Sequence, residues 1–158
     1  MRPVVSGKAR RSQHRALAAL CDAGVDARFV IVGEGPLRAR LQRQAAGLPV
    51  DFTGFVTHRD TVAQLLASAD IPLAPGPHET FGLAALESLA CGTPAVVSRT
   101  SALSEIITTD SGASADNDPA AIAAAVRTIV GWPERQRRSS ARRRAEMFTW
   151  QGWPPPGC

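Results

Sequence analysis

The chain has 158 residues, of which 44% are hydrophobic and 20% are charged. Those values exclude a disordered chain and predict a single domain with one buried core. The net charge is +4, and much of the positive charge lies in residues 8–15 and 135–144. No aromatic residues alternate with these basic runs, so a nucleic-acid partner is not expected. We interpret residues 135–144 as a solvated helix face, with Trp132 and Trp150 packed on the core, and leave contact with lipid open.

Cys21, Cys91 and Cys158 lie far apart and show no metal-ligand spacing. They predict a reducing compartment and no structural metal. The N-terminal MRPVVSGKARR lacks the apolar stretch of a secretory signal, and the sequence contains no run of 18 apolar residues. We therefore expect a cytoplasmic protein, and leave open a peripheral contact with the inner face of the plasma membrane.

Short β-branched runs alternate with longer helical patterns, which is typical of βα units that build a parallel sheet. The expected strands are residues 28–33, 50–53, 71–74 and 94–98, and the expected helices are residues 13–23, 36–46, 61–68, 83–91, 101–108 and 119–130. The predicted fold is α/β, a Rossmann-like doubly wound parallel sheet over residues 13–150. Residues 1–12 are expected to be irregular, with the stub of a first strand at Val4 and Val5, and residues 151–158 to form an irregular proline-rich tail.

The most informative stretch is PGPHETFGLAALESLACGTP, residues 75–94. A turn-rich loop follows an expected strand there, and a helix is expected to begin near Phe81 or Gly82. Open α/β folds bind their ligands at this carboxyl edge of the sheet. The backbone N–H groups of Phe81, Gly82 and Leu83, together with the helix dipole, therefore predict an anion site that suits a phosphate.

Two carboxylates flank this expected phosphate site, Glu79 and Glu87, eight residues apart. With a helix-like turn between them, their side chains point within roughly 80 degrees of each other. Both could then face one cleft and accept charge-assisted hydrogen bonds from sugar hydroxyls. The alternative is that Glu79 is simply an acidic residue at a helix N-terminus and Glu87 a surface residue, and spacing alone does not decide between the two.

The string HETFGLAALESLACGTP strongly resembles the donor-site motif of the GT4 glycosyltransferases, a large family of retaining enzymes with the GT-B fold. The segments VIVGEGP (30–36), DFTGFV (51–56) and ASADIPLAPGPHETFG resemble other parts of that family in the same order. The resemblance covers roughly residues 13–150 and looks closest to actinobacterial GDP-mannose-dependent α-mannosyltransferases. It implies a single GT-B half-domain, the C-terminal half that binds the donor.

The resemblance implies transfer of a hexose, mannose by subgroup, from a nucleoside diphosphate sugar to a lipid or glycan acceptor with retention of configuration. It implies no cofactor and no metal, so amides and basic side chains would stabilise the leaving group. Carried over to this chain, Glu79 is the catalytic residue beside the donor sugar, and Glu87 binds the ribose hydroxyls. The other implied donor-binding residues are Phe55 and Val56 at the base, the backbones of Phe81, Gly82 and Leu83 at the diphosphate, and Gly33, His78, Thr80, Lys8 and Arg11.

The chain departs from the family in two places. Family members carry a Gly-Arg pair and then a Lys after the first strand, where this chain reads SGKARRSQHR. The resemblance would put Lys8 at the position of the Arg, and Arg10 or Arg11 near the position of the Lys. A lysine keeps the charge of an arginine but cannot form its two parallel hydrogen bonds, so weaker donor binding is expected. The second departure is the absence of a match to the N-terminal acceptor domain and its histidine, so we expect a fragment that is incomplete as an enzyme.

Three other functions match parts of the same pattern. A nucleotide-sugar-binding module without catalysis, or a degenerate remnant, would show the same motif. A Rossmann oxidoreductase is disfavoured, because Arg38 stands where the GxGxxG fingerprint that begins at Gly33 needs its third glycine. A glycosidase with Glu79 and Glu87 as its two carboxylates is disfavoured by the phosphate-binding character of the helix start.

Overall fold

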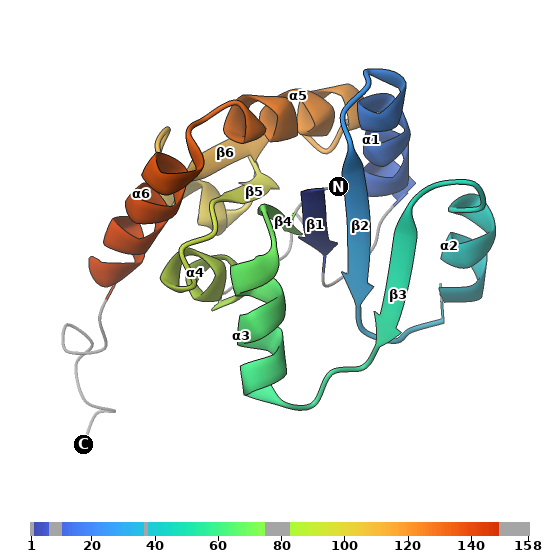
Figure 1. Ribbon diagram of the computed structural model, residues 1–158, viewed down its shortest axis with the longest axis horizontal. Helices are drawn as coiled ribbons and strands as arrows, with labels where there is room; N and C mark the ends of the chain where they lie inside the picture. The colour runs from blue at the N-terminus through green and yellow to red at the C-terminus, as the bar shows by residue number, and fades with distance from the viewer. Residues whose placement is uncertain (1, 7–10, 37, 75–82, 149–158) are drawn as a thin grey trace.

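The computed structural model describes residues 2–6, 11–36, 38–74 and 83–148 (Figure 1). They form one six-stranded sheet in the order β3-β2-β1-β4-β5-β6, and every strand pair is parallel. The strands are β1 (Arg2–Ser6), β2 (Ala27–Val32), β3 (Val50–Gly54), β4 (Ile71–Ala74), β5 (Ala95–Ser98) and β6 (Gly112–Ala115). The predicted doubly wound α/β fold is confirmed.

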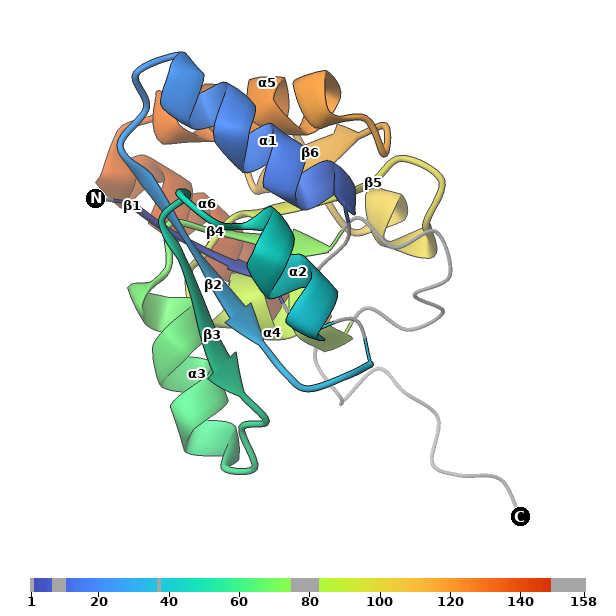
Figure 2. The same cartoon turned by 90° about the vertical axis from the view of Figure 1, so that its right-hand side faces the viewer.

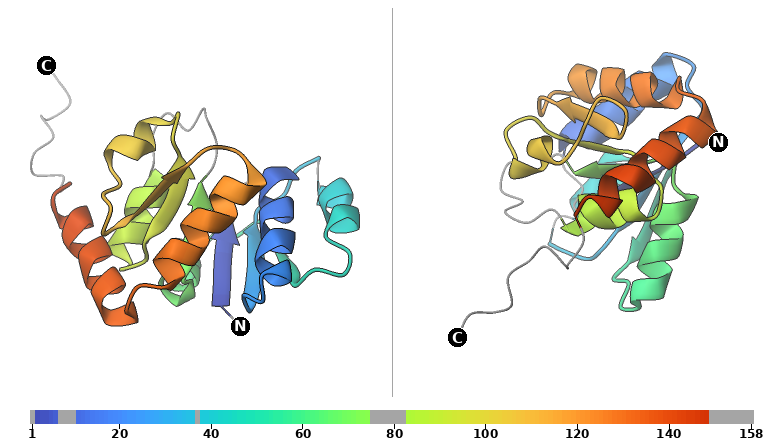
Figure 3. Two further views of the ribbon diagram at one scale, coloured as in Figure 1. Left: turned by 90° about the horizontal axis from the view of Figure 1, so that it is seen from above. Right: turned by 90° about the vertical axis from the view of Figure 1, so that its left-hand side faces the viewer.

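Helices cover both faces of this sheet. They are α1 (Arg11–Asp22), α2 (Arg38–Gln44), α3 (Arg59–Ser68), α4 (Leu83–Ala90), α5 (Pro119–Val130) and α6 (Glu134–Glu146), with a 3-10 turn η1 (Ala102–Glu105). Helices α1 and α5 pack together on one face, α3 and α4 pack together on the other, and α6 packs on α4 (Figure 2 and Figure 3). This two-sided cover explains why the central strands β4 and β5 are buried along almost their whole length.

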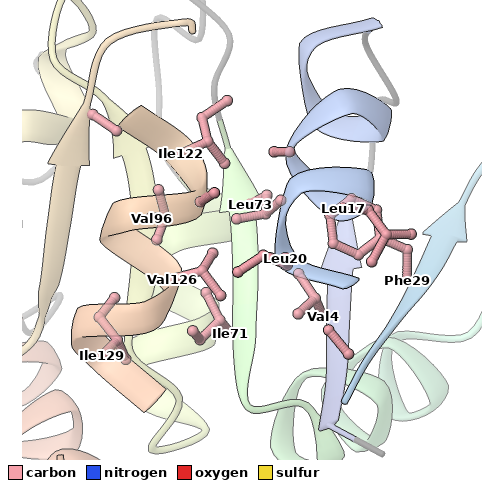
Figure 4. Packing of buried hydrophobic residues seen from close by; sticks show 14 residues of the cluster. Val4, Leu17, Leu20, Phe29, Ile71, Leu73, Val96, Ile122, Val126 and Ile129 are labelled. Atoms are coloured by element: carbon pink, nitrogen blue, oxygen red, sulfur yellow. The ribbon is translucent and has the colours of Figure 1, made fainter. Parts of the chain in front are cut away.

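The main hydrophobic core lies between the sheet and the pair α1 and α5 (Figure 4). Its largest buried side chains come from four strands and two helices: Val4, Phe29, Ile71, Leu73 and Val96, with Leu17 and Leu20 of α1 and Ile122, Val126 and Ile129 of α5. A smaller cluster of Ala85, Ala95, Val97 and Leu103 brings together α4, β5 and η1.

Strand β1 is longer and more central than the expected stub. It pairs on both sides, with Val4 opposite Phe29 of β2 and opposite Ile71 of β4, and Val4 is fully buried. The following helix begins at Arg11 rather than at residue 13. Pairing on both edges stabilises a strand whose short apolar run gives only a weak signal in the sequence.

Two further expectations differ from the structure. Strand β6 was not predicted, because its sequence GASA consists of residues with low strand propensity. Gly112 at its start lies so close to β5 that a Cβ atom there would stand 2.2 Å from the carbonyl oxygen of Ala95. The helix expected over residues 101–108 is only the four-residue turn η1.

The prediction that residues 135–144 form a solvated helix face is wrong for several of its arginines. Arg137 is only 1% exposed and forms a salt bridge with Asp70, whose side chain is 13% exposed. Trp132 packs against the main core as expected, whereas Trp150 lies outside the described residues. Burial of a charged side chain is tolerated when an opposite charge pairs with it.

Other arginines of α6 bind the carbonyl groups at the ends of neighbouring helices. Arg138 donates to the carbonyls of Ala67 and Ala69 at the end of α3, at 3.0 and 3.3 Å. Arg142 donates to the carbonyl of Ala90 at the end of α4. Arg144 donates to the carbonyl of Ile106 after η1, at 2.7 Å. These carbonyls have no partner within their own helix, and they carry the negative end of the helix dipole. The basic run therefore fastens α6 to three other elements.

Candidate functional site

The strand order predicts a ligand crevice at the carboxyl ends of β1 and β4. The chain runs outward from β1 to β3 on one side and from β4 to β6 on the other, so the direction of winding reverses between these two strands. Ser6 and Leu73 are paired near their ends. Ligands of open α/β sheets bind at such a reversal point.

The two segments that leave this crevice, residues 7–10 and 75–82, lie outside the described residues. Six predicted site residues fall there: Lys8, His78, Glu79, Thr80, Phe81 and Gly82. The helices that follow them are described, and they begin at Arg11 and at Leu83. The diphosphate site stays a prediction, since most of its residues lie in these two segments.

The loops after β2 and β3 are joined by their glycines. The Gly33 backbone N–H donates to the Gly54 carbonyl at 2.7 Å, and both residues have positive φ, 119° and 76°. Glycine adopts this backbone conformation without the strain that a side chain would cause. The bridge leaves Phe55 74% exposed at the end of β3, with Val56 partly buried beside it in the chain.

A set of side-chain contacts also joins these loops, and the sequence analysis did not predict it. Arg38 forms an ion pair with Glu34, and its guanidinium lies 5.9 Å from the centre of the Phe52 ring. A Cβ atom on Gly54 would stand 2.9 Å from Glu34 Oε1, but the Glu34 side chain can shift, so it is the positive φ that requires glycine at this position. The i,i+4 spacing of Glu34 and Arg38 is the signal that could have revealed the pair.

Glu87 lies on the exposed side of α4. Its neighbours Ser88 and Leu89 are fully buried, while the Glu87 side chain is 45% exposed. Its Oε1 atom stands 3.9 Å from Nη2 of Arg59, the first residue of α3. One turn further on, burial and then the charge of Glu87 raise the pKa of the Cys91 thiol, against a lowering effect of Arg142.

The C-terminal end of α4 is fixed by buried hydroxyl groups. Ser88 Oγ donates to the Thr93 carbonyl at 2.8 Å, and Thr93 Oγ1 donates to the Leu66 carbonyl at 2.7 Å. Because Leu66 belongs to α3, these bonds fix α4 relative to α3. They hold α4, the helix that carries Glu87, against the neighbouring α3 (Figure 1).

The structure therefore brings Gly33, Phe55 and Val56 together at the ends of β2 and β3, and Arg59 links that loop to Glu87. Arg59 is the site residue that the sequence analysis missed, because its partner is 28 positions away in the chain. Within the described ranges, no group of three or more His, Cys, Asp or Glu side chains is placed to hold a metal ion. No helix in those ranges is long and apolar enough to cross a bilayer.

The sequence profile described as "Glycosyl transferases group 1" matches residues 8–131, which is most of the chain. The chain belongs to this glycosyltransferase family. The match begins just after β1 and ends after α5, so it includes both glycine loops, α4 and the segment that carries Glu79.

Two mycobacterial relatives show how far the similarity extends. The chain is 81% identical over 136 residues to the GDP-mannose-dependent alpha-(1-6)-phosphatidylinositol dimannoside mannosyltransferase of Mycobacterium tuberculosis (strain ATCC 25177 / H37Ra), covering 86% of this chain and 36% of that protein. It is 38% identical over 132 residues to the glycogen synthase of M. tuberculosis (strain CDC 1551 / Oshkosh), covering 78% of this chain and 32% of that protein. The chain thus spans about a third of the length of both relatives. The expected resemblance to GDP-mannose-dependent mannosyltransferases is confirmed.

Solved structures show the same fold at low sequence identity. The catalytic domain of cholesterol-alpha-glucosyltransferase from Helicobacter pylori superposes with a TM-score of 0.79 at 16% identity, covering 94% of this chain and 100% of that one. Sucrose-phosphate synthase from Thermosynechococcus elongatus gives a TM-score of 0.76 at 24% identity, covering 95% of this chain and 42% of that one. These neighbours identify the fold as a GT-B half-domain. The roles of single site residues stay predictions.

Proposed function

We propose that this chain binds GDP-mannose and forms the donor side of an α-mannosyltransferase that transfers mannose with retention to a lipid or glycan acceptor. The observation that carries the proposal is the 81% identity, over 86% of the chain, to a GDP-mannose-dependent mannosyltransferase. A lipid acceptor would bring the protein to the surface of a membrane. The acceptor site would belong to a part of the enzyme other than this donor half.

The donor would lie across the carboxyl edge of the sheet. Glu87 would accept hydrogen bonds from the ribose hydroxyls, since its carboxylate is exposed and its helix is held in place. Phe55 and Val56 would line the base, and Gly33 would let the backbone approach the nucleotide closely. Charge-assisted hydrogen bonds of this kind are roughly twice as strong as neutral ones, so Glu87 should contribute a large share of the affinity.

The diphosphate and the sugar would bind along the segments that follow β1 and β4. Lys8, Arg11 and the backbone N–H groups of residues 81–83 would stabilise the charge that develops on the leaving group, without a metal ion. Glu79 would bind the hydroxyls of the donor sugar beside the reacting carbon, with His78 and Thr80 as its neighbours in the donor loop.

Calorimetric titration of GDP-mannose into single variants tests these assignments. Glu87→Ala and Glu79→Ala should each weaken binding about 10- to 100-fold, because each removes hydrogen bonds to a charged group. Asp22→Ala is the matched control, since Asp22 is an exposed acid at the far end of α1. Unchanged affinity in both glutamate variants would contradict the proposal. Binding without transfer by the enzyme that contains this half would instead favour a non-catalytic nucleotide-sugar-binding module.

A further inference from the structure

Arg59 differs from the arginines that fasten α6. Its side chain is 94% exposed, and its ion pair with Glu87 is long, at 3.9 Å. Exposed pairs of this kind contribute about 0–1 kcal/mol, so the pair can separate when either partner finds a better one. In the part of the chain that the structure describes, Glu87 is the ion-pair partner of Arg59, and no buried contact fixes the guanidinium.

The position of Arg59 places it between the two parts of the proposed nucleotide site. It follows Val56 by three residues and begins α3, so it sits at the end of the loop that would line the base. Its guanidinium also reaches the carboxylate that would bind the ribose. A base is joined to its ribose by a single bond, so we expect a base on that ribose to lie within reach of Arg59.

Binding of the ribose would also release Arg59. Once Glu87 accepts hydrogen bonds from the ribose hydroxyls, its oxygen atoms are engaged and the weak pair with Arg59 loses its stabilisation. The guanidinium then has five unpaired N–H donors beside the base edge. Guanine offers two acceptors side by side, O6 and N7, which match the two-pronged geometry of arginine. Adenine presents an amino donor in place of O6, and the single ring of uracil has no N7.

We propose that Arg59 recognises the base of the bound nucleotide and makes this site selective for guanine. The exposed ring of Phe55 would complement it, because stacking on an aromatic ring adds affinity for every base without distinguishing between them. Arg59 thus supplies selectivity and Phe55 supplies general affinity. This inference rests on the proposed function, since it requires a nucleotide whose ribose is bound by Glu87.

Dissociation constants for GDP, ADP and UDP, measured by calorimetry, test the inference. Arg59→Ala should weaken GDP binding about tenfold while UDP binding changes by less than about twofold, since a bidentate contact to guanine is lost. Arg59→Lys should lose the same selectivity although it keeps the charge, because a lysine ammonium cannot donate two parallel hydrogen bonds to O6 and N7. Arg43→Ala, an exposed position on α2, is the control for the loss of one positive charge.

The outcomes separate this inference from the proposed function. If Arg59→Ala weakens GDP, ADP and UDP equally, Arg59 binds phosphate and the inference is overturned, while the proposed function stands. If Arg59→Ala leaves the affinity for GDP unchanged, the inference is also overturned. If the folded wild-type chain binds none of the three nucleotides, the proposed function and the role of Arg59 fail together.

Discussion

Thr93 and Leu66 lie 27 residues apart in the chain, and the Thr93 hydroxyl donates a 2.7 Å hydrogen bond to the Leu66 carbonyl. Thr93 is fully buried and follows α4, whereas Leu66 lies in the last turn of α3. The bond therefore joins the helix that carries Glu87 to the helix that begins with Arg59. It supports the two helices of the proposed donor site.

Thr93→Val should destabilise the chain by about 0.5–1.5 kcal/mol, because it removes the buried hydrogen bond that the Thr93 hydroxyl donates to the Leu66 carbonyl, which keeps only the 3.2 Å bond from the Ala69 N–H. Thr128→Val is the control, since the Thr128 hydroxyl bonds a carbonyl on the exposed side of α5. That substitution should change the free energy of unfolding by no more than about 0.5 kcal/mol. Urea denaturation measures both values, and equal losses in the two variants would show that the buried bond has no special role.

The salt bridge between Arg137 and Asp70 offers a comparison of buried and exposed charges. Asp70→Asn leaves Arg137, 1% exposed, without a partner charge, and should cost about 3–5 kcal/mol. Asp116→Asn breaks the pair between Asp116 and Arg99, whose side chains are 63% and 64% exposed, and should cost less than about 1 kcal/mol. Thermal or chemical denaturation distinguishes these values, and a stable Asp70→Asn variant would contradict the buried role of Arg137.

Gly112 is expected to tolerate no side chain. In Gly112→Ala the new Cβ atom would meet the backbone of Ala95, which cannot move without disturbing β5, so a loss of at least about 1–3 kcal/mol is expected. Gly35→Ala is the matched control, because no atom lies within 4 Å of the Cβ position there. A Gly112→Ala variant as stable as Gly35→Ala would mean that β5 and β6 do not pair as described.

Cys91 reports on the charge of Glu87. Burial and the negative charge of Glu87 both raise the pKa of its thiol, so at pH 8 it should react with iodoacetamide more slowly than a free cysteine. Glu87→Gln removes one of these causes, lowers the pKa and should speed the reaction severalfold. The measurement needs a Cys21→Ser, Cys158→Ser background, with Glu105→Gln as the control. An unchanged rate in Glu87→Gln would show that the two groups are not electrostatically coupled.

Periodicity and capping residues were sufficient to predict several elements from the sequence. Helix α5 has the predicted bounds, 119–130, because Asp118 caps it and Ile122, Val126 and Ile129 mark its buried side. Strand β4, with the sequence IPLA, likewise has the predicted bounds, since all four of its residues are apolar. These signals lie within one element and need no knowledge of its neighbours.

The features that the sequence did not predict depend on partners that are distant in the chain. The arginines of α6 were predicted to form a solvated face, because no sequence pattern indicates that they bind the backbone carbonyls of Ala67 and Ala90. The pair of Arg59 with Glu87 is of the same kind. By contrast, the motif around Glu79 and Glu87 could be recognised by its resemblance to a family, although periodicity alone left the role of both residues open.

The most direct test of donor binding is a thermal-shift titration of the 158-residue chain with GDP-mannose, UDP-glucose and NAD. A ligand present at 100 times its dissociation constant adds about 2.7 kcal/mol, which corresponds to a rise in Tm of roughly 5 to 10 °C for a domain of this size. We expect such a rise with GDP-mannose and a smaller one with UDP-glucose and with NAD. A folded chain whose Tm does not change with GDP-mannose would contradict it.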